Sequence, residues 1–138
     1  MSDAARPAHQ PPRRAGGQAS AKGEGRWGMD LWSGCAWFST WFYRRLNWNA
    51  GFERKRLDAL KAHLPDGAWE TLLLAIRNHL EQRRPLNLQV CARLPDGRME
   101  WWLIEGLAER NASGRPVYLD CRTRALSPEH HDPFGDAP

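Results

Sequence analysis

Residues 96–106 read Asp-Gly-Arg-Met-Glu-Trp-Trp-Leu-Ile-Glu-Gly, and this stretch decides the fold. Asp-Gly is a strong short-range signal for a two-residue β-hairpin turn, and the run after it is rich in residues that favour strands. A second Gly-containing turn follows at residues 111–114, before another strand-like run. The pattern therefore predicts a three-stranded antiparallel meander over residues 86–94, 98–110 and 115–125.

The middle strand of this meander is apolar on both faces near its start, with Trp101 and Leu103 on one side and Trp102 and Ile104 on the other. A sheet that helices cover on one face only cannot bury both sets. One tryptophan should therefore face the outer surface and need a cover. We expect Trp101 to face the interior, and we expect an outer docking surface made by Trp102, Ile104 and Tyr118.

A helix is predicted directly before the meander, over residues 66–84. Asp66 is a plausible N-cap, Arg83 and Arg84 suit the negative end of the helix dipole, and Pro85 stops the helix. Apolar residues recur at helical spacing and predict one buried face. These residues are Trp69, Leu72, Leu73, Ile76 and Leu80.

The segment before this helix predicts a hairpin and shorter helices. Strands are expected over residues 26–32 and 35–39, with a turn at Ser33-Gly34 between them, and a helix over 41–46. Residues 47–51 break that helix, and one or two short helices are expected within 52–64. The order β-β-α-α-α-β-β-β predicts an α+β fold with its helices on one face of an antiparallel sheet.

The composition places one domain in the middle of the chain. Residues 1–25 and 127–138 are rich in Ala, Gly, Pro and polar residues, so we expect disordered tails around a folded unit over 26–126. No run of 18 apolar residues predicts a membrane span, and no apolar stretch near the N-terminus predicts a secretory signal. The three cysteines, Cys35, Cys91 and Cys121, lack metal-type spacing and are expected to be reduced thiols in a cytoplasmic protein.

Several short motifs occur in the same order as in a known family. They are Trp32-Ser33-Gly34 with Trp37 and Ser39, Leu46-Asn47-Trp48, His63-Leu64-Pro65-Asp66, Asp96-Gly97 with Trp101 and Gly106, and Gly114-Arg115-Pro116. Together they resemble the PAS domain, most closely its PAS fold-3-like subfamily. The resemblance covers nearly all of residues 26–126 and implies a five-stranded antiparallel sheet with helices on one face.

The resemblance departs from the family at the end of the last strand. Residues 124–126 read Arg-Ala-Leu where PAS domains typically have an Asp-Ile-Thr-like triplet that leads to an output domain. The chain stops twelve residues later, at Pro138. We therefore expect either a stand-alone PAS-like protein of bacterial type or an input-domain fragment of a sensor histidine kinase or diguanylate cyclase.

The residues that bind cofactors in such relatives do not occur at the matching positions of this sequence. Flavin photosensors need an Asn-Cys pair on an early helix, and none of the cysteines follows an Asn, so we expect no flavin adduct. Haem-binding relatives carry a His in the first half of the long helix, whereas His79 lies near the end of that helix, so we expect no haem. His130-His131 beside Asp132 would make a poor metal site, so no metal is expected.

The resemblance implies a non-catalytic sensory module that binds a small ligand or another protein, such as a second copy of itself. No nucleophile, phosphate loop or zinc-protease motif points to an enzyme. Pocket candidates between the long helix and the sheet are Trp37, Leu73, Ile76, His79 and Trp101.

The alternative is a nucleic-acid-binding module. The net charge is +4, and basic residues cluster at Arg44-Arg45, Arg54-Lys55-Arg56 and Arg83-Arg84 in a chain with eight tryptophans. Each basic cluster also suits a helix end or a solvated face. We therefore do not expect nucleic acid to be the partner.

Overall fold

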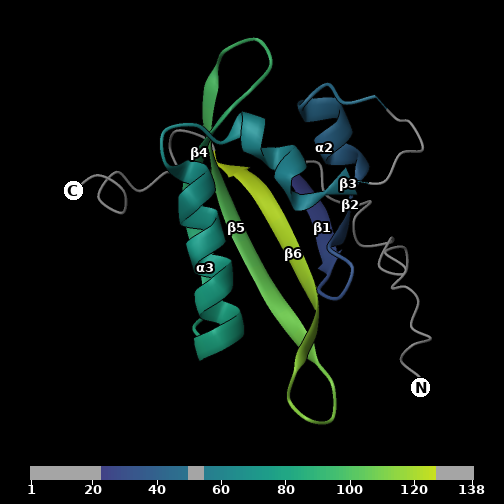
Figure 1. Cartoon of the computed structure of the whole chain (residues 1–138). Helices are drawn as coiled ribbons and strands as arrows, with labels where there is room; N and C mark the ends of the chain where they lie inside the picture. The colour runs from purple at the N-terminus through teal and green to yellow at the C-terminus, as the bar shows by residue number, and fades with distance from the viewer. Residues whose placement is uncertain (1–22, 50–54, 127–138) are drawn as a thin grey trace.

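The computed structural model describes residues 23–49 and 55–126. Within them, six strands form one antiparallel sheet in the order β3-β2-β1-β6-β5-β4 (Figure 1). The strands are β1 (Glu24–Asp30), β2 (Cys35–Phe38), β3 (Lys55–Arg56), β4 (Leu86–Arg93), β5 (Met99–Arg110) and β6 (Pro116–Leu126). The helices are α2 (Thr40–Arg45), the 3-10 helix η3 (Leu57–His63) and α3 (Ala68–Gln82).

The predicted α+β class and element order are confirmed, with one strand more than expected. The additional strand, β3, has two residues that pair with Cys35 and Ala36 at the edge of the sheet. The predicted folded unit began at Arg26, whereas β1 already begins at Glu24. The predicted disordered tails otherwise lie outside the described residues.

The turn between β4 and β5 is one residue longer than predicted, and this reverses the faces of β5. A two-residue turn at Asp96-Gly97 would place Trp101 opposite Ala92. In the structure, the Leu94 amide donates to the Arg98 carbonyl at 2.8 Å, and the register places Trp102 opposite Val90. Gly97 supplies the positive φ of 93° that this longer turn needs. A shift of one residue moves every side chain of a strand to the other face.

The interior is filled by aromatic and aliphatic side chains under the three helices. Trp27, Phe42 and Trp102 are fully buried, and the Phe42 and Trp102 ring centroids lie 6.0 Å apart in an edge-to-face arrangement. The indole N–H of Trp27 donates to Thr123 Oγ1 at 2.9 Å, so its one polar group is satisfied. Leu72 of α3 and Ile104 of β5 are also fully buried.

Helix α3 covers β4 and β5 with a narrower face than predicted. Its buried residues are Trp69, Leu72, Ile76 and His79. Leu73 is 40% exposed, because it lies about 100° around the helix from Leu72. The predicted N-cap Asp66 is also wrong: Gly67 holds that position, and both residues have positive φ, 52° for Asp66 and 87° for Gly67.

Hydrogen bonds of His79 and Arg110 connect the C-terminal end of α3 to β5. The Ala108 amide donates to His79 Nε2 at 3.0 Å, so His79 Nδ1 carries the hydrogen that the Arg84 carbonyl accepts at 2.6 Å. Arg110 Nη2 donates to the carbonyls of Leu80 and His79 at 3.1 and 3.4 Å. β4 begins opposite Gly106, so Ala108 lies beyond the β4 ladder and His79 supplies its acceptor.

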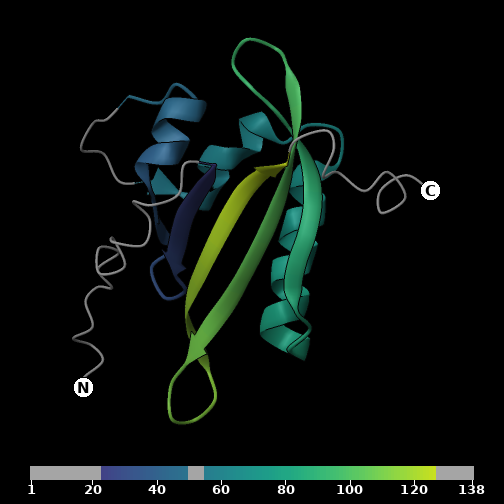
Figure 2. The same cartoon turned by 180° about the vertical axis from the view of Figure 1, so that it is seen from behind.

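The opposite face of the sheet, called here the outer face, carries no described helix (Figure 2). The register defines its members, because residues directly opposite one another in an antiparallel pair share a face. From β2 and β1 they include Trp37, Gly28, Arg26 and Glu24; from β6 and β5 they include Tyr118, Asp120, Arg122, Arg124, Trp101, Leu103, Glu105 and Leu107.

Candidate functional site: the outer face of the sheet

One end of the outer face is closed by an aromatic pair. The Trp37 indole N–H donates to the Tyr118 hydroxyl across β1. This contact passes over Gly28, where an added Cβ would lie 2.6 Å from Trp37 Nε1 and closer still to the Tyr118 oxygen. Gly28 therefore leaves the room in which two aromatic side chains from β2 and β6 meet.

The middle of the outer face is a band of charges of both signs. Arg122 Nη2 donates to Glu105 Oε1 at 3.2 Å and its Nη1 lies 3.7 Å from Glu24 Oε2. Arg26 Nη2 lies 3.6 Å from Asp120 Oδ1. These partly exposed pairs are individually weak, so they define the pattern of charge more than they stabilise the fold.

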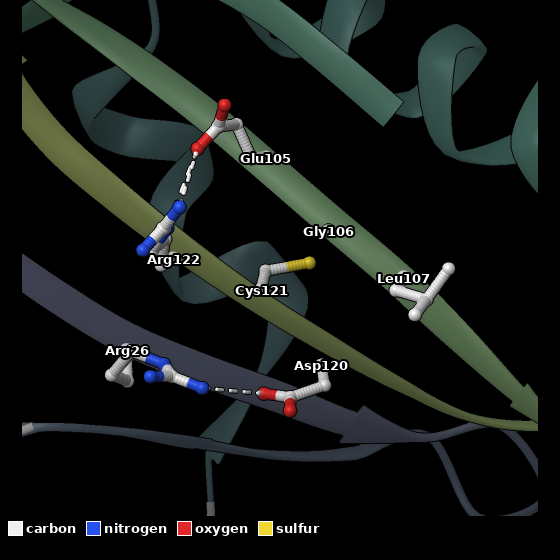
Figure 3. A pocket seen from close by; sticks show the side chains of 7 residues that line it. All are labelled: Arg26, Glu105, Gly106, Leu107, Asp120, Cys121 and Arg122. Carbon is white, nitrogen blue, oxygen red and sulfur yellow. Dashed lines mark hydrogen bonds and ion pairs between the residues drawn. The ribbon is translucent and has the colours of Figure 1, made fainter. Parts of the chain in front are cut away.

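A shallow hollow of about 310 Å³ lies within this band (Figure 3). Figure 3 shows Arg122 directed toward Glu105 on one side of it and Arg26 directed toward Asp120 on the other. Leu107, which is 68% exposed, forms an apolar wall. Gly106 and Cys121 form its floor.

The thiol of Cys121 lies on the inner side of this floor, where it is buried and inert. Burial raises the pKa of Cys121 well above 9.0, and the neighbouring Asp120 carboxylate raises it further, while Arg26 opposes the shift. The thiolate, which is the nucleophile and metal ligand, is therefore disfavoured at neutral pH. Among the described residues, no cluster of three or more His, Cys, Asp or Glu side chains could hold a metal ion.

The residues predicted to form one pocket are spread over three places. Ile76 and His79 lie inside, between α3 and the sheet, and both ring nitrogens of His79 are used by backbone groups. Trp37 and Trp101 lie on the outer face. Leu73 is exposed on α3. The structure therefore brings together only Ile76 and His79.

The predicted docking surface needs a similar correction. Trp102 and Ile104 are fully buried against the helices, because the longer β4–β5 turn turns them inward. Tyr118 does lie on the outer face, although the Trp37 contact leaves it only 7% exposed. The outer positions of β5 belong to Trp101, Leu103, Glu105 and Leu107.

The charged members of the outer face were missed as site residues. The alternation of β1 and β6 in the sequence already places Arg26 with Gly28, and Asp120 with Arg122, on single faces. The pairing of β1 with β6, which sets Arg26 opposite Arg122, joins residues nearly one hundred positions apart and has no local signal.

Two of the basic residues considered for nucleic-acid binding have partners within the chain. Arg45 forms a bidentate pair with Glu100, at 2.6 and 3.0 Å. Although burial opposes it, hydrogen bonds from Arg45 and Trp102 lower the pKa of Glu100. Lys55 Nζ lies 5.0 Å from the Trp48 ring centroid, within cation–π range.

Trp48 also takes part in a histidine contact that predicts a pH-dependent stability. Trp48 Nε1 donates to His63 Nε2 at 3.3 Å, and His63 Nδ1 lies 3.3 Å from the Arg93 carbonyl, so both bonds need a neutral ring. Burial lowers the pKa of His63 below 6.5, and the bond to Arg93 opposes this only in part. The unfolded chain therefore binds more protons just below pH 6.5, and stability falls as pH decreases from 6.5 toward the folded pKa.

We expect the free energy of unfolding from denaturant titrations to be lower at about pH 5.5 than at about pH 7.5, where the unfolded histidine is neutral. His63→Gln, which retains hydrogen-bonding groups but does not titrate, should reduce this difference. An equal loss of stability in the wild type and in His63→Gln would contradict the assignment.

Comparison with known proteins identifies the fold. Neither a protein-family model nor a curated protein matches the chain. Among solved structures, the N-terminal domain of a diguanylate cyclase with a PAS/PAC sensor from Marinobacter aquaeolei is similar at a TM-score of 0.67 and 16% identity, over 78% of this chain and 99% of that one. A sensory box histidine kinase/response regulator from Burkholderia thailandensis gives 0.66 and 18%, over 84% and 86%.

The PAS domain of a protein from Colwellia psychrerythraea is also similar, with a TM-score of 0.64 and 14% identity over 84% of this chain and 96% of that one. The chain therefore has the fold of a PAS domain, as the sequence resemblance predicted. No helix in the described part of the chain is long and apolar enough to cross a membrane.

Proposed function

We propose, from the PAS fold of this chain, that it is a non-catalytic sensory module that transmits signals by docking to another protein through its outer face. The similar structures come from proteins named as a sensory box histidine kinase and a diguanylate cyclase with a sensor, which supports a signalling role by analogy of fold. The proposal rests on one contrast. The interior between the helices and the sheet is filled, whereas the outer face presents large side chains to the surface.

Because the interior is filled, docking at the surface is favoured over the binding of a small molecule between α3 and the sheet. Leu72 of α3 and Ile104 of β5 are fully buried there, in one hydrophobic cluster with Trp27, Phe42 and Trp102. A ligand would have to displace close-packed side chains, and repacking a core costs free energy. The surface is therefore the better place for recognition.

The side chains of the outer face favour a second copy of the chain as the partner. Its apolar members Leu103, Leu107 and Trp101 flank a band in which basic and acidic residues occur together. If two copies met face to face about a two-fold axis parallel to β6, β1 of one copy would lie over β5 of the other. Arg26 of each copy would then face Glu105 of its partner, so the charges of β1 and β5 are complementary, while each residue of β6 would face its own counterpart across the axis.

The test compares two exposed leucines that lie on different faces. Leu107 is on the outer face and Leu74 is on α3, with 68% and 54% of their surface exposed. We expect the wild type and Leu74→Asp to be dimers by multi-angle light scattering, and Leu107→Asp to be a monomer, because a carboxylate would be desolvated in the interface. A monomeric wild type, or a Leu107→Asp dimer of unchanged affinity, would refute docking between two copies.

A further inference from the structure

The strongest unexplained feature of the outer face is the opposition of two arginines. Arg26 of β1 and Arg122 of β6 are direct partners in the antiparallel register, so their side chains leave the sheet on the same face. Like charges directly opposite one another on neighbouring strands are destabilising. A sequence that places two guanidinium groups at such a position sets up a local conflict, and local conflicts of this kind are often found at functional sites.

The carboxylates around the two arginines offset the repulsion between the guanidinium groups only in part. Arg26 reaches Asp120 at 3.6 Å, beyond hydrogen-bond distance, while Arg122 donates to Glu105 at 3.2 and 3.3 Å. Arg26 Nε is buried, and within the described part of the chain it has no hydrogen-bond partner. Nearly all buried donors in proteins find an acceptor, so the Arg26 guanidinium lacks an acceptor that the described residues do not supply.

The hollow gives such an acceptor room. It holds about 310 Å³ and is lined by both arginines and by the exposed side chain of Leu107. This volume is at the lower end of the range for small-molecule sites. A guanidinium group recognises the two oxygens of a carboxylate through parallel N–H donors, and charge-assisted bonds of this type are among the strongest hydrogen bonds in proteins.

We propose that this hollow binds a small molecule through a carboxylate group that bridges Arg26 and Arg122. One carboxylate oxygen accepts from the Arg26 guanidinium, and the other accepts from the Arg122 guanidinium. An apolar body of a few carbon atoms lies against Leu107. Glu105 and Asp120 stay beside the arginines and restrict the site to ligands with few negative charges, because a second charge would meet these carboxylates.

The side-chain N–H of an arginine gives its own signal in proton–nitrogen correlation spectra, so binding at the Arg26 guanidinium can be followed through that signal. We expect acetate, and with higher affinity butyrate, to shift the Arg26 Nε–H signal saturably toward lower field, while chloride at the same ionic strength leaves it unchanged. Butyrate should bind more tightly because its chain contacts Leu107. The proposal is overturned if chloride and acetate act alike, or if the Arg26 signal does not move.

One variant and one matched control locate the site. Arg122→Gln should weaken butyrate binding about tenfold or more, since it removes one charge-assisted contact. Arg124→Gln is the control, because Arg124 lies on the same face of β6 but does not line the hollow. An equal effect of the two substitutions would show a general effect of charge and would contradict the site. The circular dichroism spectrum of each variant checks that it remains folded. The butyrate titrations are done with the chain dilute enough to be monomeric, so that a second copy does not cover the outer face.

Discussion

Replacing Trp102 with alanine is expected to destabilise the protein by about 3–5 kcal/mol, the range for the loss of a buried tryptophan. Trp102 is fully buried, its ring lies against Trp41 and Phe42, and its indole N–H donates to Glu100 Oε1 at 2.9 Å. The substitution would leave a large cavity under α2 and remove one donor from the Arg45–Glu100 pair. Denaturant titration with fluorescence or circular dichroism detection measures the loss.

The neighbouring Trp101→Ala is the matched control for this prediction. Trp101 has the same chemistry and the same strand, but it lies on the outer face and is only partly buried. We expect it to cost less than about 1.5 kcal/mol when the chain is dilute enough to be monomeric, because partly exposed positions tolerate truncation better. If Trp101→Ala were the more damaging of the two, the assignment of the two faces of β5 would be wrong.

Replacing His79 with alanine is the second substitution with a large expected effect, about 2–4 kcal/mol. It removes the acceptor of the Ala108 amide and the donor to the Arg84 carbonyl, and it leaves a cavity at the end of α3. An unpaired buried polar group costs more than the bond itself contributes, because it has lost water as well. The free energy of unfolding should fall accordingly.

Amide hydrogen exchange distinguishes this bonding role from packing alone. In the wild type the Ala108 amide should exchange slowly, and in His79→Ala it should exchange markedly faster. His79→Gln, whose side-chain oxygen can reach the same amide, should recover part of the protection. If Ala108 exchanged equally fast in all three proteins, His79 would not be its acceptor in solution.

The element order was predictable from the sequence because its signals are local. The stripe of Leu86, Val90 and Ala92 identified the inner face of β4, and Pro85 marked the end of the helix region before it. The faces of β5 were not predictable in the same way, since they depend on the length of one turn. Asp96-Gly97 suits a two-residue turn, and the three-residue turn with Gly97 at positive φ reversed the positions of Trp101 and Trp102.

The candidate site depended even more on contacts that are distant in sequence. Trp37 was expected in the pocket, but its partner Tyr118 lies 81 residues away, on a strand that pairs with β1 rather than β2. His79 was expected between the long helix and the sheet and is buried there, yet its acceptor role arises because β4 starts opposite Gly106 and leaves Ala108 without a partner on β4. Helical periodicity gives the direction of a side chain, while the partner depends on where strands begin and end.

The central claim is that recognition takes place on the outer face and not in the filled interior. The most direct test is hydroxyl-radical footprinting of the full chain below and above the concentration at which it self-associates. We predict that Leu107 and Trp101 lose reactivity as the concentration rises, while Leu74 on α3 keeps the reactivity of an exposed leucine. Unchanged reactivity of Leu107, or protection of Leu74 instead, would contradict the account.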